Sequence, residues 1–101
     1  MIIFSETISL DRGIENDWLD WMQNVQIPKM LETNLFESHK ILKLLDPIVD
    51  DRMVTYSMQY CCLSMAIYRK FEREHSQKLQ KAHSERYGNL FVSFKTLLEQ
   101  V

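Results

Sequence analysis

Four segments of the chain alternate between apolar and polar residues, the period-two pattern that predicts a β-strand with one buried face. They cover residues 2–10, 38–45, 53–61 and 90–98. In the clearest of them, residues 53–61, the side chains expected to face the core are Val54, Tyr56, Met58 and Tyr60. Glu6 is a charged residue that interrupts the apolar side of the first strand.

Between these strands, apolar residues recur at helical spacing in two places. Those of the first helix are Ile14, Trp18, Trp21, Met22 and Val25, with the tryptophans expected in the core. Pro28 interrupts this pattern and predicts the first turn of a short second helix that ends near Asn34. Ser64 predicts the N-cap of the longest helix and Gly88 its C-cap. Its inner stripe is expected to contain Ile67, Phe71, His75, Leu79 and Ala82.

The resulting order, β-α-β-β-α-β, predicts a single α+β domain over residues 1–101. We expect a ferredoxin-like sandwich: a four-stranded antiparallel sheet, with the first and third strands in the centre and two helices on one face. The alternation predicts that the helices cover the side that carries Phe4, Ile8, Tyr56, Met58, Val92 and Phe94.

The other face of the sheet is expected to be uncovered and mixed in character. By alternation it would carry Ile3, Ser5, Thr7, Ser9, His39, Ile41, Lys43, Thr55, Ser57, Gln59, Phe91, Ser93, Lys95 and Leu97. A second copy of the same chain commonly closes such a face, so we expect a homodimer. The space between the two sheets would have the apolar walls and sparse polar groups of a small-molecule pocket. The candidate ligand-binding residues are His39, Lys43, Ser57, Gln59 and Lys95.

Several short motifs resemble a family of short bacterial proteins classed as a domain of unknown function, and the likeness covers nearly the whole chain. The motifs are Trp18-x-x-Trp21-Met22, Ile27-Pro28, Tyr56-Ser57-Met58-Gln59-Tyr60, His83-x-x-Arg86-Tyr87 and the ending from Phe91 to Glu99. Such proteins are similar in plan to the dimeric α+β barrel superfamily. That superfamily includes cofactor-free monooxygenases, small-molecule isomerases, haem-degrading enzymes and ligand-sensing domains. The resemblance implies the fold and the dimer, but no particular activity.

The sequence departs from the pattern of that family at two positions. Gln26 stands where the family often has His, and Lys95 stands where the usual residue is Arg. A mechanism that needs an imidazole or a bidentate guanidinium at these positions is therefore disfavoured, because lysine offers only a point charge.

Charge and cysteine usage restrict the partners and the compartment. The formal net charge of -2 lacks the basic excess of a nucleic-acid binder. Cys61 and Cys62 are adjacent, which suits neither a disulfide framework nor the spacing of a zinc site. The N-terminal segment lacks the pattern of a signal peptide, and no apolar run approaches the ~18 residues that a membrane span needs. We therefore expect a cytoplasmic protein that binds neither nucleic acid nor membrane.

The three histidines do not predict a metal site, since none belongs to a paired ligand motif. His75 is expected on the inner face of the long helix, partly buried. His83 and Arg86 are expected to complement the dipole at the end of that helix. His39 is expected on the uncovered face. No metal and no cofactor is implied by any motif.

Two functions remain open from the residues alone. The first is a dimeric binding or accessory protein whose enclosed space holds side chains or a small ligand. The alternative is a cofactor-independent enzyme, monooxygenase-like or isomerase-like, that acts on a small aromatic or anionic molecule. In the alternative, Lys95 and Gln59 would hold an oxygen atom and His39 would exchange a proton. The first is favoured because this residue set contains no recognisable nucleophile.

Overall fold

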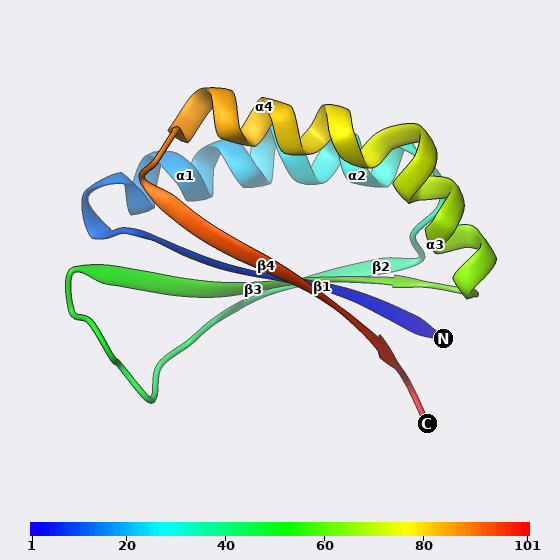
Figure 1. The fold of residues 1–101 in the computed structure, drawn as a ribbon, viewed down its shortest axis with the longest axis horizontal. Helices are drawn as coiled ribbons and strands as arrows, with labels where there is room; N and C mark the ends of the chain where they lie inside the picture. The colour runs from blue at the N-terminus through cyan, green and yellow to red at the C-terminus, as the bar shows by residue number, and fades with distance from the viewer.

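The computed structural model describes residues 1–101 and has the β-α-β-β-α-β order that the sequence predicts. Its four strands are β1 (Ile2–Asp11), β2 (Ser38–Lys43), β3 (Met53–Cys62) and β4 (Phe91–Glu99). They form one antiparallel sheet in the order β2-β3-β1-β4, so the first and third strands are central. All helices lie on one face of this sheet (Figure 1). The fold is therefore an α+β, ferredoxin-like sandwich.

Each of the two helical segments contains one π-helical turn. The first segment consists of a 3-10 turn (Arg12–Ile14), α1 (Glu15–Trp21), the π turn Met22–Gln26 and α2 (Ile27–Glu32). The second consists of α3 (Met65–Phe71), the π turn Glu72–Ser76 and α4 (Gln77–Tyr87). None of the helices has the length and apolar character that crossing a bilayer requires.

The predicted helix ends are confirmed. Pro28 lies in the first turn of α2. Ser64 caps α3, because its hydroxyl accepts a hydrogen bond from the Ile67 backbone N–H at 3.3 Å. Gly88 follows α4 with a φ of 56°, in the left-handed region that glycine adopts at little cost.

The π turn in the second segment changes which side chains face the sheet. A π turn widens the helical repeat by one residue, so every later residue is shifted around the helix axis. Phe71 and Leu79 are buried, as the predicted stripe requires, but Ser76 is buried in place of His75. The half-buried His75 instead stacks on Phe71, with ring centroids 6.2 Å apart.

The core lies between the sheet and the helices and is rich in aromatic side chains. Trp18 is fully buried and Trp21 nearly so, which confirms the expected packing role of this pair. The Trp18 and Tyr56 rings have centroids 5.1 Å apart. At the other end of the core, Phe4 and Phe71 have centroids 5.8 Å apart. Such contacts stabilise the protein beyond the burial of area.

The prediction that Val92 and Phe94 face the helices is wrong. In the register of β1 and β4, Glu6 pairs with Lys95 and Ile8 pairs with Ser93. Because paired residues share a face, Phe91, Ser93, Lys95 and Leu97 lie on the helix side. Val92 and Phe94 lie on the uncovered face and are 67% and 62% exposed. β4 is an edge strand with apolar residues on both sides, so its alternation does not identify the buried side.

The predicted orientation of β2 is wrong for the same reason. His39, Ile41 and Lys43 pair with Tyr60, Met58 and Tyr56, whose side chains are buried beneath the helices. The uncovered side of this edge strand carries Ser38, Lys40 and Leu42 instead.

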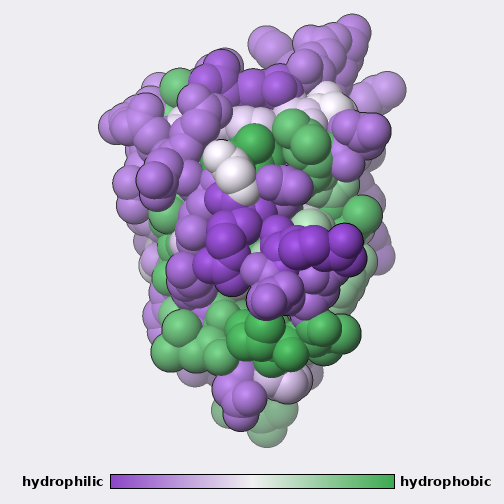
Figure 2. Space-filling view, turned by 90° about the vertical axis from the view of Figure 1, so that its left-hand side faces the viewer, coloured by the Kyte–Doolittle hydropathy of each residue, from purple (hydrophilic) through white to green (hydrophobic).

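The central strands have the predicted orientation, with serine, threonine and glutamine side chains on the uncovered face. Ser9 and Thr55 join their hydroxyls across the strands at 2.7 Å, and Ser5 and Ser57 do so at 3.3 Å. The exposed apolar residues of this face are Leu42, Val92, Phe94 and Leu98. Viewed from the end that carries the β2–β3 loop, the molecule has a band of hydrophobic side chains on the sheet side and a mostly hydrophilic helix side (Figure 2).

Candidate functional site

A cavity of about 440 Å³ lies between the sheet and both helical segments. It forms beside β4, where the strand presents Ser93 and Lys95 toward the helices. The helical residues opposite include Ser76 and Ser84. Small and charged side chains fill this part of the interlayer space less completely than the large apolar residues of the central strands. The core is therefore interrupted at one edge of the sheet.

The cavity has apolar walls interrupted by polar groups, because just over half of its lining residues are apolar. Its apolar lining includes Phe4, Ile8, Met22, Met30, Phe71 and Leu79. These residues come from β1 and from both helical segments, and all six are buried. Small-molecule sites combine apolar walls with polar groups in this way, although the polar share of this lining is larger than usual.

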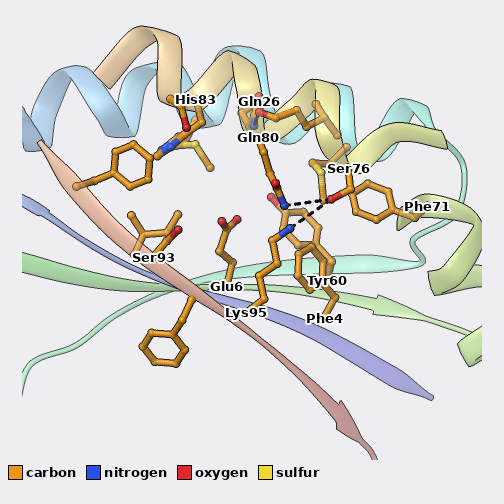
Figure 3. Close-up of a pocket in the computed structure, with 17 residues that line it drawn as sticks. Phe4, Glu6, Gln26, Tyr60, Phe71, Ser76, Gln80, His83, Ser93 and Lys95 are labelled. Carbon is orange, nitrogen blue, oxygen red and sulfur yellow. Dashed lines mark hydrogen bonds between the residues drawn. The ribbon is translucent and has the colours of Figure 1, made fainter. Parts of the chain in front are cut away.

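Glu6 and Lys95 contribute opposite charges from neighbouring strands. Both side chains project from the sheet toward the helices (Figure 3). The Lys95 ammonium donates to the Ser76 hydroxyl at 3.2 Å, and the Gln80 side-chain amide lies 3.2 Å from the same oxygen. The Lys95 Nζ atom also lies 5.7 Å from the centroid of the Phe4 ring. Glu6 makes no hydrogen bond in the chain and has no ion pair within 4.0 Å.

Burial controls the ionisation of Glu6. Desolvation raises the pKa of its carboxyl above the ordinary value, and the positive charge of Lys95 opposes this effect without cancelling it. Glu6 is thus a carboxyl group whose charged form is disfavoured by its surroundings. Such perturbed groups occur most often at functional sites.

Gln26 supplies an acceptor that has no partner. Its amide nitrogen donates to the Leu79 carbonyl oxygen at 2.9 Å, which fixes the orientation of the amide group. The residue is only 7% exposed, and its Oε1 atom is buried without a hydrogen-bond partner. A buried acceptor without a partner costs about 1–3 kcal/mol, so a donor that reached Oε1 would be favoured.

His83 lines the cavity as a neutral side chain. Its Nε2 atom accepts a hydrogen bond from the Trp18 indole N–H at 2.8 Å, and its ring meets the Phe91 ring at a centroid distance of 4.1 Å. Burial lowers the pKa of His83 to about 4. The expectation that His83 is a cation that complements the helix dipole is therefore wrong, because the helix turns this residue inward.

The structure does not bring the five predicted ligand residues together. Lys95 lines the cavity, whereas Lys43 forms an ion pair with Glu15 at 2.8 Å. Ser57 and Gln59 lie on the uncovered face, where the Gln59 amide donates to the Ser57 hydroxyl at 3.3 Å.

His39 and Gln59 do meet, but at a different site. They line a smaller pocket of about 170 Å³ near the end of β2 and β3. Gln59 belongs to this pocket as well as to the uncovered face, and the five residues do not form one site.

Of the cavity lining, the sequence interpretation assigned only Lys95 to the candidate site, and it missed Glu6, Gln26, Ser76 and His83 among others. One signal for Glu6 was present, since a charged residue interrupted the apolar face of an otherwise regular strand. Ser76 and His83 depend on the π turn, which no residue pattern announced.

Candidate metal ligands are not clustered in the structure. No group of three or more His, Cys, Asp or Glu side chains is placed to hold a metal ion. Cys61 and Cys62 are both free thiols.

Several solved structures share this fold. HapK from Hahella chejuensis aligns with a TM-score of 0.71 and 12% identity, over 100% of this chain and 93% of HapK. An EthD-family protein from Bacillus halodurans aligns with a TM-score of 0.68 and 10% identity, over 100% of both chains. A dimeric ferredoxin-like protein from an uncultured marine organism aligns with a TM-score of 0.69 and 15% identity, over 100% of this chain and 95% of the other. At these identities the likeness establishes the fold and nothing more.

Sequence comparison identifies a family but no characterised relative. No curated protein matches the chain at a significant level. The model of one family, described as a domain of unknown function (DUF4286), matches residues 1–101. The chain, with its ferredoxin-like sheet and its helix-side cavity, therefore belongs to the DUF4286 family.

Proposed function

We propose that the protein binds a small, mainly apolar molecule in the cavity between the sheet and the helices. The observation that carries this proposal is the unpartnered Oε1 atom of Gln26, which is buried in a residue that lines the cavity. Folding rarely leaves a buried acceptor without a partner, and a bound donor would supply one.

The size and polarity of the cavity indicate the kind of ligand. A volume of about 440 Å³ falls within the range of ordinary small-molecule sites. Lys95 can receive an anionic or carbonyl oxygen, and Gln26 can receive a hydroxyl or N–H group. The ligand therefore combines an apolar, for example aromatic, body with one oxygen acceptor and one hydrogen-bond donor.

This location replaces the space between two sheets as the proposed binding site. Three of the predicted ligand residues, His39, Lys43 and Lys95, lie on the helix side of the sheet. The uncovered face therefore does not carry these three basic residues. It carries serine and threonine hydroxyls, Gln59 and exposed apolar residues.

The uncovered face is instead proposed as the surface on which two copies of the chain pair. Phe94 and Val92 are exposed there, and similar structures are described as dimeric ferredoxin-like proteins. Pairing of two such faces would remove these apolar side chains from water. The protein would then be a homodimer with one cavity in each protomer.

The binding proposal is tested with 4-hydroxyphenylacetate, which has an aromatic body, an anionic oxygen and a hydroxyl donor. We expect amide resonances of cavity residues to shift in a two-dimensional NMR titration. Lys95→Met should weaken the binding at least about tenfold, the effect of removing one charged contact worth ~1.4 kcal/mol.

Lys40→Met is the matched control, since Lys40 lies on the uncovered face of the other edge strand. It should leave the affinity unchanged. Shifts confined to the uncovered face, or equal affinities of the wild type and Lys95→Met, would contradict the proposed site.

A further inference from the structure

The cavity contains one carboxyl group, one cation and one histidine, and they have different surroundings. Glu6 is the only acidic residue in the lining, Lys95 the only lysine or arginine, and His83 the only histidine. The imidazole of His83 already accepts the Trp18 hydrogen bond. Lys95 donates one hydrogen bond, to the Ser76 hydroxyl, and lies near the Phe4 ring, whereas Glu6 forms no hydrogen bond or ion pair.

Glu6 and Lys95 share a cross-strand position, but they do not neutralise each other by direct contact. Their backbones are paired between β1 and β4, and both side chains point into the same space (Figure 3). No ion pair within 4.0 Å joins them. A partly buried carboxyl group without a partner is costly to the fold, and groups perturbed in this way cluster at functional sites.

We propose that Glu6 is a catalytic acid–base group, and that the cavity transfers a proton at a carbon atom next to a carbonyl group of its ligand. This inference rests on the proposed function, because it requires that a small molecule enter the cavity. The substrate class is an enolisable carbonyl compound with an apolar or aromatic body.

The chemistry requires no cofactor. The Glu6 carboxylate removes a proton from the carbon next to the carbonyl, and the electrons of the broken C–H bond form a C=C bond. The π electrons of the C=O bond move onto oxygen, and the Lys95 ammonium stabilises the resulting enolate oxygen. Glu6 then returns the proton to carbon or to the oxygen. No electrons are gained or lost overall, and Lys95 keeps its protons throughout.

The surroundings of Glu6 suit this role. Burial raises the pKa of Glu6, which brings a carboxyl group closer to the neutral range where a general base works best. The charged or titratable neighbours that line the space are Lys95 on β4, Tyr60 on β3 and His83 on the second helical segment; the first segment contributes none. Burial and the charge of Glu6 raise the pKa of Tyr60, and burial lowers the pKa of His83, so both are neutral at pH 7. Lys95 is therefore the only countercharge.

The test measures exchange of hydrogen for deuterium in two probes, phenylpyruvate and benzoylacetone, by proton NMR in D₂O. We expect the wild-type protein to accelerate exchange at the carbon next to the carbonyl above the rate in buffer. Glu6→Gln should lower the protein-dependent rate about 100-fold or more, the usual contribution of a general base. Glu6→Asp should restore part of that rate.

The same samples separate the two proposals. Amide shifts of cavity residues report whether each probe binds, independently of exchange. Binding of a probe by wild type and by Glu6→Gln, with exchange lost only in the variant, supports the inference. Binding without accelerated exchange of either probe overturns the catalytic role and leaves the binding function intact. If both probes fail to bind but 4-hydroxyphenylacetate binds, the catalytic inference is overturned and the binding function stands. If none of the three molecules binds, both proposals are overturned.

Two further measurements test whether the loss of exchange in Glu6→Gln comes from the Glu6 carboxyl group itself. Glu85→Gln removes an exposed carboxyl from α4, where it pairs with Lys81, and should leave the exchange rate unchanged. The rate with wild-type protein should rise with pH as Glu6 ionises, while the Glu6→Gln rate should lack this step. A similar pH step in both proteins would overturn the assignment to Glu6.

Discussion

The central strands and the edge strands of this sheet lie in very different surroundings. On β1 and β3, the helix-side residues apart from Glu6 are nearly all buried, with Leu10 at 0% and Met58 at 1% exposed. On β4, no residue is buried and both faces carry apolar side chains. The helical layer covers the centre of the sheet fully and its β4 edge only in part.

This difference explains where the cavity lies. At the centre, large apolar side chains fill the space between the layers at ordinary packing density. At β4, Ser93 and Lys95 take their place, and the packing leaves room for a ligand. The boundary between filled core and partly covered edge thus combines apolar walls with charged groups.

The largest effect is expected when side-chain volume is removed from the centre of the sheet and, for comparison, from its edge. Met58→Ala on β3 should lower the free energy of unfolding by about 2–5 kcal/mol, because it leaves a void in a packed core. Leu97→Ala on the helix side of β4 should lower it by only about 1 kcal/mol or less, because Leu97 is already 36% exposed. Urea unfolding monitored by circular dichroism measures both. Equal losses would mean that the edge strand is packed as tightly as the centre.

The proposed dimer contact on the uncovered face of β4 is tested by measuring the oligomeric state. Phe94→Lys should weaken the proposed dimer at least about 100-fold, because it places a charge in an apolar contact. Light scattering coupled to size-exclusion chromatography measures the mass over a range of concentrations. Leu45→Lys, in the exposed β2–β3 loop, is the control and should leave the mass unchanged. A wild-type monomer at all micromolar concentrations would contradict the proposed pairing.

The buried His83, on the helix side of the sheet, predicts that the free energy of unfolding depends on pH. Its pKa is about 4 in the folded protein, below the ordinary value of 6.5, so the unfolded chain takes up the proton first as pH falls. The stability from neutral His83 is complete above pH 6.5 and is lost as pH falls toward 4. The free energy of unfolding should fall by about 2–3 kcal/mol over this interval, because a tenfold difference in proton affinity between the folded and unfolded chain corresponds to about 1.4 kcal/mol.

His83→Gln keeps an acceptor for the Trp18 N–H but does not titrate, so it should lose less stability than the wild type over this interval. His75→Gln is the control, because His75 is only half-buried, and it should follow the wild type. Unfolding curves at pH 7, 5.5 and 4 make the comparison. Parallel curves for wild type and His83→Gln would show that the histidine does not titrate with folding.

The smallest expected effect concerns Glu6 at the border of the two regions. Its folded pKa is raised, so its contribution to stability is complete below the ordinary value of 4.5 and declines as pH rises through the raised pKa. Glu6→Gln should therefore be more stable than the wild type at pH 7, by about 1 kcal/mol. The difference should vanish at pH 4. Thermal unfolding measures it, and a less stable variant at pH 7 would contradict the unpaired state of the carboxyl.

Much of the fold could be predicted because its signals are local. The alternation in residues 53–61 placed Tyr56 and Met58 correctly, since the helices cover β3 and only one of its faces can be apolar. The caps at Ser64 and Gly88 were predictable from backbone chemistry alone. The candidate site was predicted poorly, with Lys95 placed on the wrong face and most of the other lining residues missed.

The sequence by itself determined the order of the elements, the position of the central strands, the ends of the long helix and the tryptophan core. Each of these follows from residue periodicity or from the conformational limits of single residues. The tertiary structure alone decided the orientation of the edge strands, because a strand that is covered only in part leaves little free-energy difference between its two faces. It also decided that a π turn directs Ser76 and His83 inward, and so brought both into the cavity that Glu6 and Lys95 line. These contacts depend on how the layers meet, which no local pattern encodes.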